Sequence, residues 1–170
     1  SHYSTPKPVL MSGVMSAVGI SGVFVPFTME SNINDEILFF AYPSTMVHEL
    51  AHQCGFMRED EANYIAYLAC RQSDAPLVRY SGLFSAFYHA IAALEERDEE
   101  MAGEIILSLS PAVQNDVEQQ KQFWERHESI LSDISAAVID INLKLNNQAD
   151  GVASYNRMVD LLLAEQKECK

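Results

Sequence analysis

Basic residues are scarce in this sequence. It holds 11 Lys and Arg against 24 Asp and Glu, which gives a formal net charge of −13. A nucleic-acid-binding surface needs clustered Lys and Arg, and docking on anionic lipid needs a basic patch. The composition therefore argues against both, and we expect no nucleic-acid partner.

Cysteines and long apolar runs are also few. The three cysteines are odd in number and irregular in spacing (Cys54, Cys70 and Cys169). They therefore indicate neither a disulfide framework nor a CxxC zinc motif, and they leave the redox compartment open. No apolar run approaches the roughly 18 residues of a membrane-spanning helix, and no signal-peptide pattern is visible.

The remaining composition is that of an ordinary globular protein. The chain has 170 residues, of which 48% are hydrophobic and 21% are charged. This size suits one domain with a single core. We therefore expect one domain over residues 1–170, in the mainly α (α+β) class.

A small β element is expected before the helical part. The segment Gly22–Thr28 is rich in β-branched and aromatic residues and predicts a strand, and Pro26 favours an edge position. Lys7–Ile20 suggests a short helix and a turn, and Glu30–Asp35 suggests a polar loop. An extended peptide could add to the strand around Phe24, although a purely structural strand fits the same residues.

Apolar residues at helical spacing predict helices over most of the remainder. Capping residues and breakers place their ends. The predicted helices cover about Thr45–Cys54, Arg58 to a break at Asp74–Pro76, Ser81–Arg97, Glu99–Leu109, Ser110 to about Leu145, and a last segment around Met158.

One motif carries chemistry. His48, Glu49 and His52 form an HExxH pattern within the first predicted helix. Residues four apart lie on the same helix face, so the two imidazoles can hold one metal ion. Glu49 can then reach a water molecule on that metal without binding the metal itself. The alternative is an ordinary helix with two unrelated histidines.

A third ligand is expected from the next helix. A catalytic zinc ion takes three protein ligands and keeps an open position, and Gly55 allows the sharp turn between the two helices. Glu59 and Glu61 both follow that turn in the sequence. Asn63 could orient a neighbouring histidine without binding the metal itself. These acids could equally serve only to complement the helix dipole.

The segment from His48 to Asn63 resembles the gluzincin type of zinc peptidase. That type has HExxH on one helix and an ExxxD or ExxAD glutamate on a later one. The resemblance favours Glu59 as the ligand, with Asn63 in the place of the usual aspartate and an unusually short spacing after His52. The glycine at position 55 also resembles the metzincin motif, but Arg58 stands where that motif has its third histidine.

A longer resemblance is to a bacterial family that is catalogued as a domain of unknown function. Members of that family carry transmembrane helices before this region. The resemblance implies that the chain is the soluble part of a membrane-anchored protein, expected outside the cytoplasm, with its membrane segments absent from this sequence. The resemblance to this family lies in residues 7–10, His48–Gln53, Gly55–Phe56, Arg58–Asn63, Ile65–Cys70, Arg79–Gly82, Ser154–Tyr155 and Arg157–Ala164.

Together these patterns predict a zinc-dependent metallopeptidase that acts on a peptide or protein substrate. Zn²⁺ would be bound by His48, His52 and Glu59, with Glu49 as the general base. A further donor would stabilise the oxyanion. Tyr155 is favoured for that role, and the other candidates are Arg157, His89 and His127. The competing hypothesis is an inactive zinc-binding or regulatory domain that interacts with other proteins.

Overall fold

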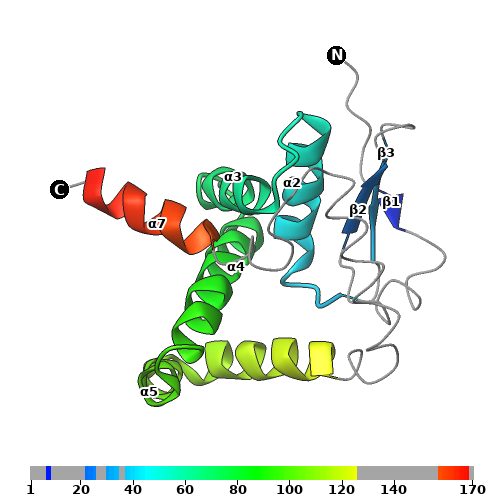
Figure 1. The fold of residues 1–170 in the computed structure, drawn as a ribbon. Helices are drawn as coiled ribbons and strands as arrows, with labels where there is room; N and C mark the ends of the chain where they lie inside the picture. Colours follow the sequence, from blue (N-terminus) through cyan, green and yellow to red (C-terminus); the bar gives the residue numbers. More distant parts are fainter. Residues whose placement is uncertain (1–6, 9–21, 26–29, 35–36, 126–156, 169–170) are drawn as a thin grey trace, which may run out of the picture.

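The chain is mainly α-helical wherever its structure is described. The computed structural model describes residues 7–8, 22–25, 30–34, 37–125 and 157–168. No helix in these ranges is long and apolar enough to cross a membrane. The helices are α2 (Tyr42–Gln53), α3 (Glu59–Arg71), α4 (Pro76–Glu95), α5 (Glu99–Ser108) and α7 (Arg157–Glu168), and residues 111–125 are also helical (Figure 1).

Three short strands lie beside α2 (Figure 1). They are β1 (Lys7–Pro8), β2 (Gly22–Val25) and β3 (Glu30–Ile33), in the order β1-β3-β2. The central strand β3 is parallel to β1 and antiparallel to β2. The strands β1 and β3 fall where the sequence suggests a helix with a turn and a polar loop. Strand pairing uses backbone groups, which side-chain polarity does not reveal.

Two helices begin earlier than the sequence indicates. Helix α2 begins at Tyr42 rather than Thr45, and α4 begins at Pro76 rather than Ser81. In the sequence, Pro76 predicts only a break after the preceding helix. Proline is favoured in the first turn of a helix, where its missing N–H has no intrahelical partner to lose. Pro76 therefore starts a helix instead of only ending the one before it.

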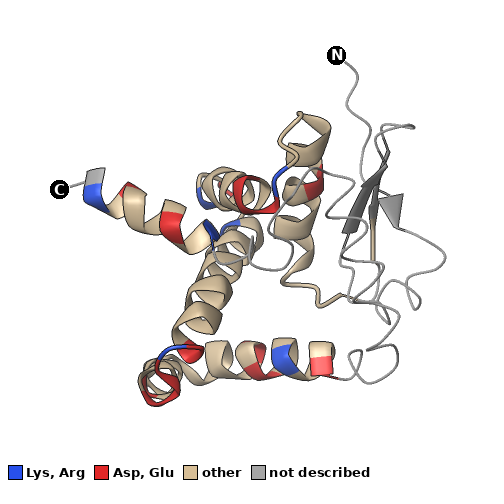
Figure 2. Ribbon diagram, in the orientation of Figure 1, with Lys and Arg blue, Asp and Glu red and all other residues tan. Residues whose placement is uncertain are grey.

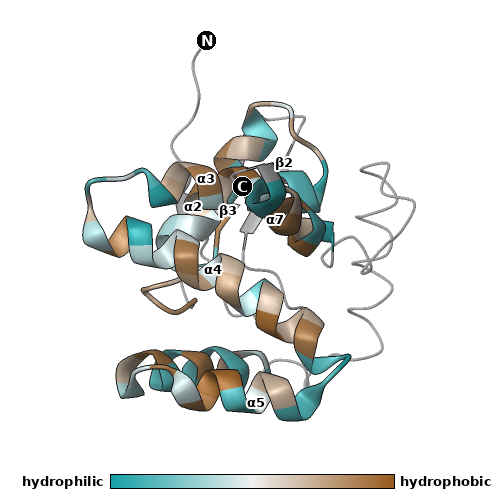
Figure 3. Cartoon of the chain, turned by 90° about the vertical axis from the view of Figure 1, so that its left-hand side faces the viewer, coloured by the Kyte–Doolittle hydropathy of each residue, from teal (hydrophilic) through white to brown (hydrophobic). Residues whose placement is uncertain are grey.

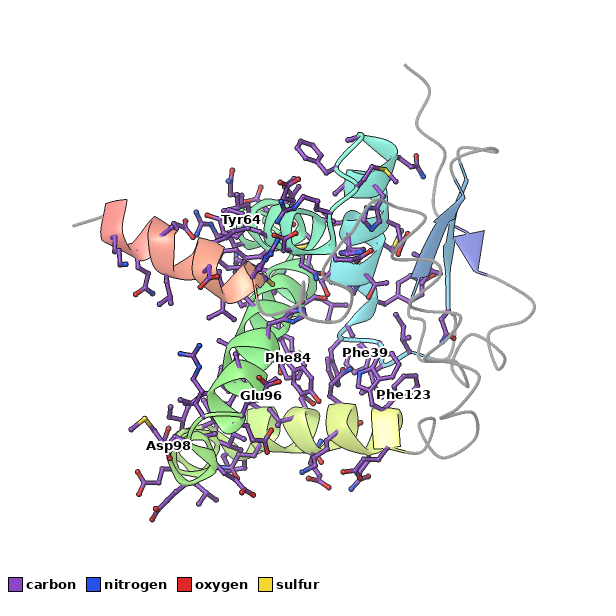
Figure 4. All side chains as sticks on the ribbon, in the orientation of Figure 1. Phe39, Tyr64, Phe84, Glu96, Asp98 and Phe123 are labelled. Atoms are coloured by element: carbon purple, nitrogen blue, oxygen red, sulfur yellow. The ribbon has the colours of Figure 1, made fainter. Side chains whose placement is uncertain are left out.

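The core gathers at the amino-terminal end of α2. Phe40 packs with Phe84 and Val117, and its ring lies edge-on to that of Phe84 at 4.9 Å. Ile37 packs with Phe123, so the helix over residues 111–125 reaches the same region (Figure 4). The segment before α2 is thus fixed by two helices that come much later in the chain.

Helix α3 is held on two sides by later helices. Its face formed by Ala62, Ala66 and Cys70 is buried, and α3 packs extensively on α4. Helix α7 contacts α3 as well, through an ion pair between Arg71 and Glu165. Figure 3 shows α5 lying beneath α4, with hydrophobic residues along both helices. Contacts with α4 and α7 therefore hold α3 and the residues at its start in place.

Candidate metal centre

Helix α2 presents both histidines of the motif on one face. His48 and His52 are one helical turn apart, and their ring centroids lie 4.5 Å from each other at an interplanar angle of 86°. Both side chains are largely shielded from solvent, with 15% of His48 and 8% of His52 exposed. The predicted helix thus brings the two imidazoles together.

The carboxy-terminal end of α2 orients His52. Gly55 adopts a φ of 99°, and the N–H groups of Gly55 and Phe56 donate to the carbonyls of His52 and Ala51. This is the Schellman arrangement, which needs a left-handed residue after the helix. It places the Phe56 carbonyl 2.7 Å from Nδ1 of His52. Since that carbonyl can only accept, Nδ1 carries the proton, and Nε2 faces the site.

Glu59, the first residue of α3, faces both histidines. Its Oε2 lies 3.1 Å from Nε2 of His48, and its Oε1 lies 3.5 Å from Nε2 of His52. Ligand atoms on a tetrahedral zinc ion with bonds of about 2.0–2.2 Å are about 3.3–3.6 Å apart. The three side chains, whose ligand atoms all lie within 4.8 Å of one another, could therefore hold a metal ion.

The rival acid is engaged elsewhere. Arg58 donates two hydrogen bonds to Asp60 and lies 3.6 Å from Glu61. Figure 2 shows acidic and basic residues side by side at the start of α3. Arg58 therefore draws two of the three acids to its own side, and Glu59 is the one that faces the histidines.

The site is electrostatically coupled. Burial raises the pKa of Glu49 to about 7, although the nearby His48 and His52 oppose the rise. Burial alone would raise the pKa of Glu59, but its hydrogen bonds with the two histidines hold that pKa well below the usual range. Burial lowers the pKa of His52, and the hydrogen bond with Glu59 outweighs this and raises it. A cation between these groups would replace protons on the imidazoles.

The predicted supporting role of Asn63 is not seen. Among the described residues Asn63 forms no hydrogen bond with either histidine, and the partner of His52 is the Phe56 carbonyl instead. Nδ1 of His48 is buried and has no hydrogen-bond partner in the part of the chain that is described. A backbone carbonyl leaves no mark in a sequence pattern, so the sequence does not reveal this contact.

The structure describes two of the four candidates for the oxyanion donor. Tyr155 and His127 fall outside the described residues, and Arg157 is exposed at the start of α7. His89 of α4 is the described candidate on which His48 acts electrostatically. Burial lowers the pKa of His89 to about 4, and the charge of His48 contributes to this shift to a smaller extent. Of the two described candidates, His89 is therefore the one that the structure relates to the histidine pair.

The fold and the site define a mainly helical protein with a three-residue candidate metal centre between two consecutive helices. The chain belongs to a family described as "Protein of unknown function (DUF3810)", whose model matches residues 1–163. No curated protein and no solved structure shows significant similarity to the chain. The resemblance to an uncharacterised family is thus confirmed, and the family itself supplies no activity.

The turn at Gly55 offers a direct test of how α2 ends. Gly55→Ala should lower the free energy of unfolding by about 1 kcal/mol or more, because φ of 99° is strained for a residue with a Cβ atom. Urea unfolding measures this change. Gly103→Ala in α5 is the matched control, since its Cβ would meet nothing within 4 Å. It should be neutral or stabilising. Equal effects of the two substitutions would contradict the assigned turn.

Proposed function

We propose that this protein is a zinc-dependent metallopeptidase in which His48, His52 and Glu59 bind the metal ion. The supporting observation is that one carboxylate lies 3.1 and 3.5 Å from the Nε2 atoms of two histidines on the adjacent helix. Two imidazoles and a carboxylate form a ligand set that catalytic zinc sites use. The small β element before this helix pair makes the proposed architecture zincin-like.

The donor set fits catalytic zinc better than structural zinc. Within the described residues, only three potential ligands come together. Structural zinc sites are closed by four protein ligands, whereas catalytic sites keep a position for water or substrate. A position left open to water would favour the peptidase over the inactive zinc-binding domain.

Each residue then has a distinct task. When bound, zinc supplies a Lewis acid that activates water and polarises the scissile carbonyl group. His48 and His52 would hold the ion through their Nε2 atoms, and the Phe56 carbonyl fixes the tautomer of His52. Glu49, next to His48 on α2, accepts a proton from the attacking water at its carboxylate. It then passes that proton to the leaving amine.

The substrate would bind as an extended peptide along β2. This strand is at the edge of the described sheet, beside α2. An edge strand exposes backbone N–H and C=O groups that an extended chain can pair with. Backbone pairing would hold the scissile bond of a peptide substrate next to the metal site without requiring a particular side chain.

We also propose that the parent protein is anchored in a membrane and carries this part outside the cytoplasm. The support is the resemblance of the sequence to a family whose members have preceding transmembrane helices. Membrane fractionation of cells that express the full-length protein, followed by protease treatment of intact cells, tests both points. Recovery in the soluble cytoplasmic fraction would refute them.

Removal of the metal tests the peptidase directly. The purified chain should contain about one zinc ion and hydrolyse unfolded protein substrates. A chelator should abolish this activity, and one equivalent of zinc should restore it, because the three ligands leave the ion exchangeable. The readouts are metal content by mass spectrometry and peptide release. Hydrolysis that persists in metal-free protein would overturn the proposal.

A further inference from the structure

We propose that Ser81 and Gly82, adjacent on α4, are positioning residues that set the two metal-binding helices against each other. Ser81 forms hydrogen bonds with α2, and Gly82 allows α3 to approach α4 closely. This inference rests on the proposed metal site, and its evidence lies in contacts one or more turns away from the ligands.

The start of α2 has one N–H group that only α4 satisfies. The first turn of a helix leaves N–H groups without intrahelical partners. Here the N–H of Tyr42 donates to the Leu38 carbonyl, and Pro43 has no N–H. Ala41, at the N-cap, has no side chain that could accept a hydrogen bond. The N–H of Ser44 donates instead to Oγ of Ser81, at 2.9 Å. Ser81 thus acts as the cap of a helix to which it does not belong.

The hydroxyl groups of Ser81 and Ser44 add two more hydrogen bonds at the start of α2. Oγ of Ser81 donates to Oγ of Ser44 at 3.0 Å, and Oγ of Ser44 donates to the Ala41 carbonyl at 2.9 Å. Ser81 is fully buried, and Ser44 is 7% exposed. A buried hydrogen bond fixes both distance and direction, since leaving its donor unpaired is costly. The pair therefore fixes the rotation of α2 about its axis.

That rotation determines where the histidines point. Ser44, His48 and His52 follow one another at four-residue intervals, so they lie along one face of α2. Helix α4 holds the first member of this row, and Glu59 of α3 faces the other two. A twist of α2 at Ser44 would carry both imidazoles away from the carboxylate.

Gly82 fixes the other helix. A Cβ atom at Gly82 would lie closer than 3.0 Å to Cβ of Cys70, which is buried on α3. Neither atom belongs to a flexible side-chain end, so any residue larger than glycine must push α3 away from α4. Glu59 begins that same helix. Two consecutive residues of α4 therefore support the histidine helix and the glutamate helix.

Cobalt binding tests the Ser81 contact in the complete 170-residue chain. Co²⁺ reports its coordination geometry through visible absorption, which loss of fold stability alone does not alter. Ser81→Ala should weaken Co²⁺ binding about tenfold and change the absorption spectrum at saturation, as losses of supporting contacts do. Ser85→Ala, one turn further along α4, is the control and should match the wild type.

A compensating second substitution tests the Gly82 contact even if the single variant folds poorly. Gly82→Ala should also weaken Co²⁺ binding about tenfold, and adding Cys70→Gly should restore most of the affinity by removing the opposing Cβ atom. If Gly82→Ala acted only by destabilising the fold, the absorption spectrum of its Co²⁺ complex at saturation would match that of the wild type. That result, or Ser81→Ala behaving like Ser85→Ala, would overturn the positioning role. Wild-type protein that binds no Co²⁺ would instead overturn the metal site itself.

Discussion

Glu49→Gln is expected to lower the rate of peptide hydrolysis by about 10²–10⁴-fold, the usual contribution of a general base. Glutamine has the shape of glutamate but cannot accept a proton at neutral pH. Glu49 is 3% exposed and lies beside the histidines without being one of the three converging ligands. The zinc content should therefore stay at about one ion per chain. Initial rates and metal analysis on the same preparations measure both effects.

The control for this substitution is Glu61→Gln. Glu61 is an acid near the site that pairs with Arg58 rather than with a histidine. Its replacement should leave both zinc content and hydrolysis unchanged. Equal hydrolysis by wild type and Glu49→Gln would remove Glu49 from the mechanism, and loss of zinc from Glu49→Gln would make it a ligand.

Glu59→Gln is expected to weaken zinc binding by more than about 100-fold. Loss of a hydrogen bond that orients a metal ligand lowers metal affinity about 10–100-fold. We expect loss of the charged ligand itself to lower the affinity further. The substitution keeps the side-chain volume but removes the negative charge that faces His48 and His52. Competition with a chromophoric chelator measures the dissociation constant.

The same Glu61→Gln variant separates the two candidate acids. If Glu59 is the ligand, Glu61→Gln retains wild-type affinity. Strong zinc binding by Glu59→Gln, together with weak binding by Glu61→Gln, would reverse the assignment and would contradict the geometry at the start of α3.

The features that the sequence predicted are local ones. The HExxH histidines share a helix face by their spacing alone, and the structure places them one turn apart. Gly55 ends α2 as expected, because only a left-handed residue completes that turn. The resemblance to gluzincins favours Glu59 as the third metal ligand. The structure places Glu59, rather than Glu61, beside both histidines.

The features that the sequence missed depend on contacts between distant residues or on the backbone. The sequence suggests that Asn63 supports a neighbouring histidine, whereas His52 is oriented by the Phe56 carbonyl. Ser81 and Ser44 are 37 positions apart, and no periodicity links them. The role of Tyr155 remains a prediction, since it lies outside the described residues.

A zinc-loaded crystal examined by anomalous scattering at the zinc edge tests the central claim most directly. One strong peak should lie about 2.0–2.2 Å from Nε2 of His48, Nε2 of His52 and a carboxylate oxygen of Glu59. The absence of any peak between these three side chains, or a zinc ion bound by other residues, would contradict the metal site and the peptidase built on it.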